Sequence, residues 1–398
     1  MRVDVVGTGV GPDSLTLEGQ DAISTADLLI GSERLLTAFA RVDQQTMSAT
    51  RPAAVIAAIE SSSAERIAVL MSGDVGYHSG AAKVAVWYQE QKPALQLRLI
   101  PGVSTVSALA ARAGLPWEDA ALISCHGSDV DLVSPVRRNR RTIALTGGNV
   151  SWLTASLVAA GFGELTVWVG ENLGLETESV TETTISETVG RTWTSLTTLL
   201  IENPTPDARI RTGIPDDEFL RGKVPMTKSA IRSVAMSHLS ITPSDICYDI
   251  GCGTGSVTVE SALSAHQGRV FAIDKNPESV ELTKLNCQRF HLGNVTVQEG
   301  LAPEGLLAWP VPDVVFIGGT TGSMREIVNL VVERNPKVRI VVTAIAVETI
   351  TAALDALTNV GLTPQITQLN VSAGRAIGGL HLMIAQNPVS IITGGCGV

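Results

Sequence analysis

Past the middle of the chain, a hydrophobic segment predicted to be a strand runs into Asp249-Ile250-Gly251-Cys252-Gly253-Thr254-Gly255. Glycines allow a tight turn after the first strand of a nucleotide-binding sheet, and they let a ligand approach the backbone closely. Dinucleotide loops usually read G-x-G-x-x-G and hold a pyrophosphate at a helix N-terminus. Here the third glycine comes one residue earlier, which favours a ligand without a phosphate, such as S-adenosylmethionine (SAM). An ordinary glycine-rich turn and a site for NAD are the alternatives.

An aspartate at the end of the next predicted strand, Val270–Ile273, strengthens this interpretation. A carboxylate in the position of Asp274 can accept hydrogen bonds from both hydroxyls of a ribose, because it carries only acceptors. The alternative is a structural role, since Asp is favoured as the N-cap of a helix and a helix is predicted to begin near Pro277. The loop and Asp274 together predict a SAM site at the carboxyl edge of a sheet.

Strands and helices alternate on both sides of this motif, which predicts a doubly wound α/β fold. In the second half, strands are predicted at 246–250, 270–273, 295–298, 314–317 and 340–343, with edge strands at 365–371 and 380–386. The polar segment Glu202–Arg209 contains two prolines and predicts a linker. We therefore expect one domain at 1–203, a linker at 204–212 and a second domain at 213–398.

The first half contains a weaker glycine motif. Val3–Val6 is predicted to be a strand, and it runs into Gly7-Thr8-Gly9-Val10-Gly11-Pro12. Two further loops of small residues, Ser72–Tyr77 and Pro101–Thr105, also follow predicted strands. Each loop alone is compatible with a simple turn. Since the carboxyl ends of parallel strands lie along one edge of a sheet, the three loops together predict a ligand cleft.

Composition narrows the class of protein. Hydrophobic residues make up 44% of the 398 residues and charged residues 17%, which is enough apolar material for two buried cores. The net charge of −10 argues against a nucleic-acid partner, which would require clustered Lys and Arg. The basic cluster Arg137–Arg141 is interpreted as a solvated loop, with an anion contact as the alternative. Scattered cysteines, histidines without ligand spacing and the lack of a long apolar run predict a cytoplasmic protein with no membrane segment and no metal site.

The motifs of the first 200 residues resemble those of the tetrapyrrole methylases, a family of SAM-dependent enzymes that methylate precorrin and related rings. The matching pieces are Gly7–Pro12, Ser72–Gly76, Pro101–Thr105, Gly147–Asn149 and Gly170–Gly174. The resemblance implies a two-lobed α/β domain that binds SAM. The SAM contacts that it implies are Val10, Asp74, Tyr77, Ser104 and Thr105. The chain departs from the family pattern at Val75, where a proline is common.

The second half resembles the decarboxylating precorrin methyltransferases, a family with a Rossmann-like fold. The matching pieces are Pro225–Lys228, Asp249–Gly255, Ala272–Pro277, Glu299–Leu306, Phe316–Gly319 and Asn387–Val389. The SAM contacts that this resemblance implies are Thr227, Gly251, Cys252, Gly253, Thr254, Gly255, Asp274 and Ala302. The order of the halves is similar to that of fused precorrin methyltransferases. It implies one SAM per domain, methylation of carbons 5 and 15 of a precorrin ring, decarboxylation of the ring C acetate in cobalamin biosynthesis, and a homo-oligomer.

The substrate implied by this resemblance sets a charge requirement. A precorrin carries several carboxylates, whereas the chain is acidic, so a local basic lining is needed to pair with them. The candidates are Arg221, Lys223, Lys228, Arg232 and Arg375, and a solvated helix face is the alternative. Because a sulfonium methyl is already electrophilic and the ring is electron-rich, orientation is expected to supply most of the rate gain. No catalytic residue is assigned.

Two other functions stay open. One is a fused SAM methyltransferase that acts on RNA or protein, and the other is a carrier that binds SAM or a precorrin without turnover. The acidic charge argues against RNA. The segment Phe316-Ile317-Gly318-Gly319 stands where many amino-methylating enzymes have Asn-Pro-Pro-Tyr, and its glycines offer no side chain to orient an amine.

Overall fold

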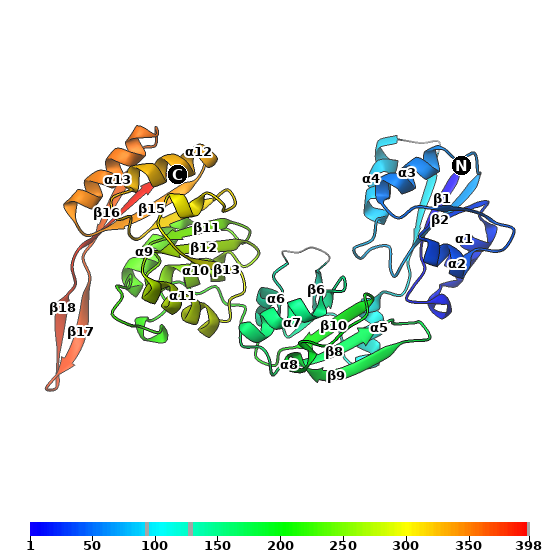
Figure 1. Cartoon of the computed structure of the whole chain (residues 1–398), viewed down its shortest axis with the longest axis horizontal. Helices are drawn as coiled ribbons and strands as arrows, with labels where there is room; N and C mark the ends of the chain where they lie inside the picture. The colour runs from blue at the N-terminus through cyan, green and yellow to red at the C-terminus, as the bar shows by residue number, and fades with distance from the viewer. Residues whose placement is uncertain (92–94, 126–129, 396–398) are drawn as a thin grey trace. The chain divides into compact units, whose positions relative to one another are not determined.

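The computed structural model describes residues 1–91, 95–125 and 130–395, and it divides into two compact units (Figure 1). The first unit consists of Met1–Val130, Asn139–Ala155 and Glu164–Thr205, and the second consists of Asp131–Arg138, Ser156–Gly163 and Pro206–Val398. The domain limits expected from the sequence stay a prediction.

A five-stranded parallel sheet with the order β3-β2-β4-β1-β5 lies in the first unit. Its strands are β1 (Arg2–Gly7), β2 (Leu28–Gly31), β3 (Gln45–Ser48), β4 (Arg66–Met71) and β5 (Gln96–Ile100). Its helices are α1 (Leu17–Thr25), α2 (Glu33–Phe39), α3 (Pro52–Glu60) and α4 (Ala81–Gln91). Val3 and Val5 enter one core with α3 and α4, whereas Val6 enters the other with α1 and α2. Helices thus cover both faces, which explains why β1 is largely apolar.

A second, mixed sheet with the order β6-β7-β10-β8-β9 also belongs to the first unit. Its strands are β6 (Ala121–Ser124), β7 (Arg141–Leu145), β8 (Thr166–Glu171), β9 (Ser179–Thr184) and β10 (Thr197–Glu202). The strand β10 is antiparallel to both of its neighbours. Leu109 of α5 (Thr105–Ala113) packs with Ile143 and Leu200 in one core. The remaining helices of this half are α6 (Val133–Arg138), α7 (Val150–Ala159) and α8 (Ile185–Thr188). The prediction of a two-lobed α/β domain is confirmed.

A seven-stranded sheet with the order β13-β12-β11-β14-β15-β19-β16 forms the centre of the second unit. Its strands are β11 (Ile246–Ile250), β12 (Arg269–Asp274), β13 (Val295–Glu299), β14 (Val314–Ile317), β15 (Arg339–Ala344), β16 (Gln365–Leu369) and β19 (Val389–Gly394). The strands from β13 to β15 are parallel to one another. Its helices are α9 (Ser229–Leu239), α10 (Ser256–Ser264), α11 (Pro277–Arg289), α12 (Met324–Arg334) and α13 (Val347–Asn359). Because α12 and α13 pack in one core and α9 and α10 in the other, the predicted doubly wound fold is confirmed.

The C-terminal strands differ from the prediction. The strand β19, which the sequence does not predict, lies between β15 and β16 and pairs with both. The strand expected at 380–386 is β18 (Leu380–Ala385), and it pairs only with β17 (Ser372–Ile377), in a hairpin that extends beyond the sheet (Figure 1). An apolar run indicates a strand but not its partner, and the pairing of β19 with β15 joins segments about 50 residues apart in the sequence, whereas β18 pairs with the strand directly before it.

The remaining differences concern polar or short elements. The strands β2, β3, β9 and β10 are not predicted from the sequence; β3 and β9 lack a buried face and β2 has only four residues, whereas β10 is a buried six-residue strand that the sequence analysis should have found. Short 3-10 helices cover Pro12–Ser14, Asp216–Glu218 and Glu304–Leu306. In the described part of the chain, no helix is both long enough and apolar enough to cross a membrane.

Candidate functional site

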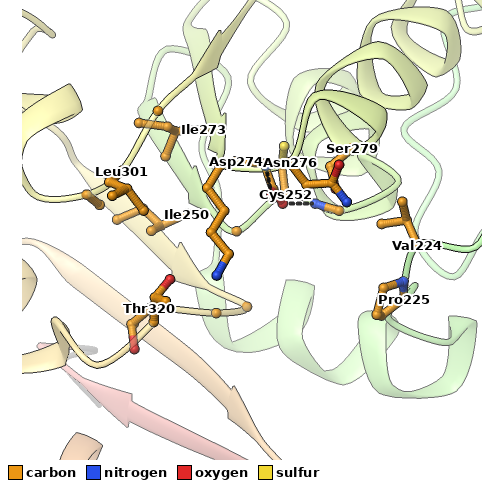
Figure 2. A pocket seen from close by; sticks show the side chains of 18 of the residues that line it. Val224, Pro225, Ile250, Cys252, Ile273, Asp274, Asn276, Ser279, Leu301 and Thr320 are labelled. Carbon is orange, nitrogen blue, oxygen red and sulfur yellow. Dashed lines mark hydrogen bonds between the residues drawn. The ribbon is translucent and has the colours of Figure 1, made fainter.

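A pocket of about 420 Å³ lies at the carboxyl ends of four parallel strands of the second unit. Each of these strands, β11 to β14, is followed by a loop that lines the pocket. In Figure 2, Ile250, Leu301 and Thr320 lie on one side of the pocket, and Val224 and Pro225 lie on the other. The strand order changes direction between β11 and β14, which is where ligands bind in open α/β sheets.

The glycine loop after β11 is shaped by a close approach to the neighbouring loop. Gly251 has φ +76°, and a Cβ at this position would lie 2.8 Å from the backbone nitrogen of Gly319. Any other residue would be strained in its backbone and would collide with the loop after β14. A Cβ on Gly319 would meet no atom within 4 Å. The backbone is therefore open to a ligand on this side.

Asp274 holds the same loop through its carboxylate. Its Oδ2 accepts a hydrogen bond from the Gly253 nitrogen (3.0 Å) and its Oδ1 accepts one from the Asn276 nitrogen (2.9 Å). The N-cap of α11 is Asn276, whose side chain accepts a hydrogen bond from the Glu278 nitrogen, so the alternative of Asp274 as the helix cap is wrong. Each carboxylate oxygen keeps a further lone pair for a ligand hydroxyl.

Most of the predicted ligand contacts of the second unit line this pocket. Those that do are Thr227, Gly251, Cys252, Gly253, Asp274 and Ala302. Two do not: the Thr254 side chain is buried, and Gly255 packs against Thr283 where α10 begins. Burial raises the pKa of the Cys252 thiol, which keeps it protonated. Lining residues that lie outside every stretch quoted from the sequence are Val224, Ser279, Thr320 and Thr321, whereas Lys275, Asn276 and Leu301 lie within matching pieces but are not singled out as contacts.

Asp249, the first residue of the glycine motif, does not line the pocket. Its carboxyl is fully buried, and Thr258 donates a hydrogen bond to Oδ2. In the described part of the chain, Oδ1 has no hydrogen-bond partner. Burial raises the pKa of Asp249 to about 7, and the nearby charge of Asp274 adds to this effect. Asp249 thus joins the end of β11 to α10 through Thr258, at an energetic cost once it is ionised.

A second pocket, of about 320 Å³, lies within the first unit. All five ligand contacts predicted for this unit line it, namely Val10, Asp74, Tyr77, Ser104 and Thr105. The loops of the mixed sheet close it from the other side. These lining residues are Leu145, Thr146, Gly147, Asn172, Leu173, Leu175, Ser195, Leu196, Thr197 and Thr198. The sequence analysis missed Arg34 and His78, which also line it.

The three small-residue loops of the first unit meet, as predicted. A Cβ on Gly102 would lie 2.4 Å from the carbonyl oxygen of Gly73 and 2.5 Å from that of Gly7. Asp74 joins two of the loops, because its Oδ2 accepts a hydrogen bond from the Gly102 nitrogen (3.1 Å) and its Oδ1 accepts one from the Gly76 nitrogen (2.7 Å). This bond to Gly76 forms although Val75 replaces the usual proline.

The predicted basic lining lies outside both pockets. Arg221 and Lys223 are exposed, Lys228 pairs with Asp216 at 3.7 Å, and Arg375 lies on the exposed strand β17. None of the five candidates is among the described residues that line the pocket of the second unit.

The prediction for Arg232 is wrong, because its side chain is fully buried. Its Nε donates to Glu260 (2.6 Å), and its two other nitrogens donate to the carbonyl oxygens of Thr227 and Ile214. The guanidinium therefore has its partners inside the protein and cannot meet a substrate carboxylate.

The basic cluster at 137–141 is also structural. Arg137 is buried and donates to the carbonyl oxygen of Asp207, whereas Arg141 is buried and pairs with Asp119 and Glu202. Both interpretations of this cluster from the sequence, a solvated loop and an anion contact, miss these partners. Within the described residues, no group of three or more His, Cys, Asp or Glu side chains could hold a metal ion.

A doubly wound sheet whose glycine loop is held by the aspartate of the next strand defines the class of Rossmann-like nucleotide-binding domains, to which SAM-dependent methyltransferases belong. Residues 218–393 match the family described as the precorrin methyltransferase domain, and residues 2–189 match the tetrapyrrole (corrin/porphyrin) methylases. The chain belongs to the precorrin methyltransferase family, and it combines a domain of that family with a tetrapyrrole methylase domain. Methylases of this family use SAM as their methyl donor.

Individual relatives match less than half of the chain. A probable cobalt-precorrin-6B C(15)-methyltransferase (decarboxylating) of Methanothermobacter thermautotrophicus is 42% identical over 183 residues, which are 45% of this chain and 94% of the relative. The protein of the same name from Pyrobaculum calidifontis is 42% identical over 184 residues, covering 46% and 94%. Among solved structures, precorrin-6y C5,15-methyltransferase from Geobacter metallireducens has 36% sequence identity to this chain and a TM-score of 0.44. The match covers 46% of this chain and 96% of the Geobacter chain.

Proposed function

We propose that the chain is a bifunctional SAM-dependent precorrin methyltransferase of cobalamin biosynthesis. It methylates carbons 5 and 15 of a precorrin ring and decarboxylates the acetate side chain of ring C. The observation that carries this proposal is the presence of two separate pockets, one in each unit, each built on a glycine loop that an aspartate holds in place. The two halves match two families of methylases, which supports two methylations by one chain.

Methylation of carbon 15 and decarboxylation are assigned to the second unit. This assignment is supported by the relatives named C(15)-methyltransferase (decarboxylating), which correspond to less than half of this chain. Methylation of carbon 5 is then the task of the first unit. One SAM per pocket is part of the same proposal.

The residues of both pockets fit SAM. In the second unit, Asp274 has free lone pairs for the ribose hydroxyls, and the open side of Gly319 leaves room against the backbone. In the first unit, Asp74 and the N-terminus of α5 at Ser104 and Thr105 form the corresponding wall. Bound SAM supplies an electrophilic methyl group. The chain contributes orientation, and Ile250 and Leu301 provide apolar contacts in the lining.

The test is mass spectrometry of the ring after incubation of the full chain with a precorrin and methyl-labelled SAM. The expected product has gained two labelled methyl groups and has lost one CO₂. A ring that is bound but recovered unchanged would overturn the proposal and favour a carrier. Label found in RNA or protein instead would favour the other alternative, against which the glycines at 318 and 319 argue.

We further propose that the chain forms a homo-oligomer through the hairpin of β17 and β18. Leu380, Leu382 and Ile384 lie on the same face of β18, opposite Ile377, and Leu380 is 68% exposed. Both edges of the hairpin are unpaired, and an isolated two-stranded ribbon is marginally stable in water. The partner that fits this surface is a second copy of the chain. Residues 356–398 contain no Asp or Glu, although the chain as a whole is acidic. Two copies can therefore meet at the hairpin without repulsion between carboxylates.

Leu382→Asp tests this interface. The substitution lies on an exposed surface, so the fold of the monomer is expected to be unchanged by circular dichroism, while light scattering shows a smaller assembly. Ser372→Asp, at the base of the hairpin, is the control for added charge. A wild-type chain that is monomeric at micromolar concentration would contradict the proposal. The cytoplasmic location stays a prediction.

A further inference from the structure

We propose that Arg34 in the pocket of the first unit and Lys275 in the pocket of the second unit bind carboxylates of the ring substrate. This inference rests on the proposed function, since it concerns the same two pockets. It replaces the basic residues predicted from the sequence, which lie elsewhere.

Arg34 differs from most arginines of the first unit. Those paired with carboxylates are Arg2, Arg41, Arg66, Arg98, Arg112, Arg140 and Arg141. In the described part of the chain, Arg34 makes no ion pair, and its hydrogen bond goes to the hydroxyl of Ser72, at 3.2 Å. Ser72 follows β4 and lines the same pocket. The serine thus holds the guanidinium at the pocket without neutralising it.

The position of Arg34 is not explained by the stability of its helix. It is the second residue of α2, where the helix dipole favours negative rather than positive side chains. A cation at this end weakens the helix slightly, so an anion that it binds is a better explanation for its presence. The other basic side chain among the described lining residues is His78, which packs edge-on against the Tyr77 ring.

Lys275 has a similar status in the second unit. It lies between Asp274, which holds the glycine loop, and Asn276, which caps α11. Within the described residues, Lys275 has no hydrogen bond or ion pair, and it is the one cation among those that line the pocket. Its neighbours have structural roles, whereas its own ammonium group is free to meet a ligand.

Charge makes these two cations necessary. Each pocket already contains an aspartate, and the chain has a net charge of −10. A substrate carboxylate that entered either pocket without a partner would lose hydration and meet repulsion. A charge-assisted pair with a guanidinium or an ammonium group offsets both effects. The ligand class is therefore a polycarboxylate ring, with one carboxylate recognised at each pocket.

The experiment compares Arg34→Gln and Lys275→Gln with two controls, Arg51→Gln and Lys337→Gln. Arg51 and Lys337 are exposed, and neither lines a pocket. Methylation at each ring position is measured against ring concentration, and SAM binding is measured by calorimetry. We expect KM for the ring to rise about tenfold at carbon 5 in R34Q and at carbon 15 in K275Q, which corresponds to the loss of about 1.4 kcal/mol. Tm stays unchanged, and Arg34→Lys restores most of the affinity for the ring. A loss of SAM affinity in R34Q or K275Q with no change in KM for the ring would overturn the inference, because the cation would then bind the carboxylate of the methyl donor.

The outcomes separate this inference from the proposed function. If wild-type protein methylates the ring and R34Q and K275Q keep the wild-type KM, the inference is overturned and the proposed function stands. If KM rises equally in the two controls, the effect belongs to overall charge, and the inference is again overturned. If the wild-type protein transfers no methyl group, binding of uroporphyrin, a ring that carries only carboxylate substituents, is measured by fluorescence quenching. Weaker binding in both variants but not in the controls then supports the inference by itself.

Discussion

Asp74 in the first unit and Asp274 in the second hold their glycine loops with the same pair of hydrogen bonds, although the two sheets differ in strand order. Each carboxylate accepts one bond from the backbone nitrogen two residues further on and one from a glycine nitrogen in another loop. That glycine is Gly102 for Asp74 and Gly253 for Asp274. The same local solution thus serves two unrelated sheets.

The two aspartates differ in whether another strand lies between them and the glycine that they bind. In the second unit β12 and β11 are neighbours, so Asp274 reaches directly to the adjacent loop. In the first unit β1 lies between β4 and β5, and Asp74 reaches Gly102 past the end of β1 at Gly7. In the first unit, the backbone segments at Gly7, Gly73 and Gly102 therefore meet at one point, whereas in the second unit Asp274 joins two neighbouring loops. The site of the first unit therefore depends more strongly on glycines, because any side chain at these positions would separate the three backbone segments.

Gly102→Ala is the strongest test of this contrast. A Cβ there meets two carbonyl oxygens at about 2.5 Å or less, so at least one loop must move away. We expect loss of the first SAM site and a loss of unfolding free energy of about 2–4 kcal/mol. Calorimetry should show one SAM per chain, compared with the two that the proposed function gives for the wild type, and methylation of carbon 15 should be retained. Gly80→Ala, where a Cβ makes only ordinary contacts, is the control.

Arg232→Met tests how the second unit holds its pocket wall. The buried pair of Arg232 and Glu260 ties the carbonyl of Thr227, which lines the pocket, to α10. Removing the arginine leaves Glu260 buried without its counter-charge, which costs about 3–5 kcal/mol. Urea unfolding should show this loss, together with weaker SAM binding in the second site only. Lys228→Met removes a more exposed pair and should cost less than about 1 kcal/mol. Equal losses in the two variants would contradict the role given to burial.

Asp274→Asn and Asp74→Asn compare the two carboxylates directly. The amide keeps the size of the side chain, but it loses a charged acceptor and turns an N–H group toward a backbone donor. Each variant should weaken SAM binding at its own pocket by about 1.5–3 kcal/mol and leave the other pocket unchanged. Titration calorimetry together with product analysis separates the sites. A loss of both methylations in one variant would indicate that the pockets are coupled.

The smallest expected effect concerns pH and distinguishes the first strands of the two sheets. Burial would raise the pKa of Asp4 on β1, but hydrogen bonds and charges from Arg98 and Arg2 lower it, whereas burial raises the pKa of Asp249 on β11 to about 7. Between about pH 4 and pH 7 the native state keeps the Asp249 proton that the unfolded chain releases, so its contribution to stability falls as pH rises. Asp4 contributes in the opposite sense, because its stabilisation is lost on acidification below about pH 4.

Asp249→Asn should therefore become more stable relative to the wild type as pH rises from 5 to 8, by about 2–3 kcal/mol. Urea denaturation at the two pH values measures the change. Asp313→Asn, on the loop before β14, is a control for the loss of one carboxylate. A difference between D249N and the wild type that does not depend on pH would show that the carboxyl is ionised throughout.

Much of the two proposed SAM sites could be predicted from short stretches of the sequence. These features are the glycine loops, Asp74 after β4, Asp274 at the end of β12, and the alternation of strands and helices. Each of them is recognised from residues that lie close together in the sequence. Such short-range patterns reflect backbone geometry, which depends on the residue itself and on its near neighbours. The places where prediction failed are long-range. The position of β19 between β15 and β16 and the burial of Arg232 depend on segments that lie far away along the chain.

By itself, the sequence determined that the chain forms two α/β units with glycine loops after parallel strands, because strand periodicity and glycine positions are local properties. Only the tertiary structure decided which charges face the pockets. Arg232 and Arg34 are alike as residues, yet one is enclosed with Glu260 and the other lines a cavity beside Ser72. The reason is that a charged side chain takes its role from the partners that folding brings to it, and those partners are not its neighbours in the chain.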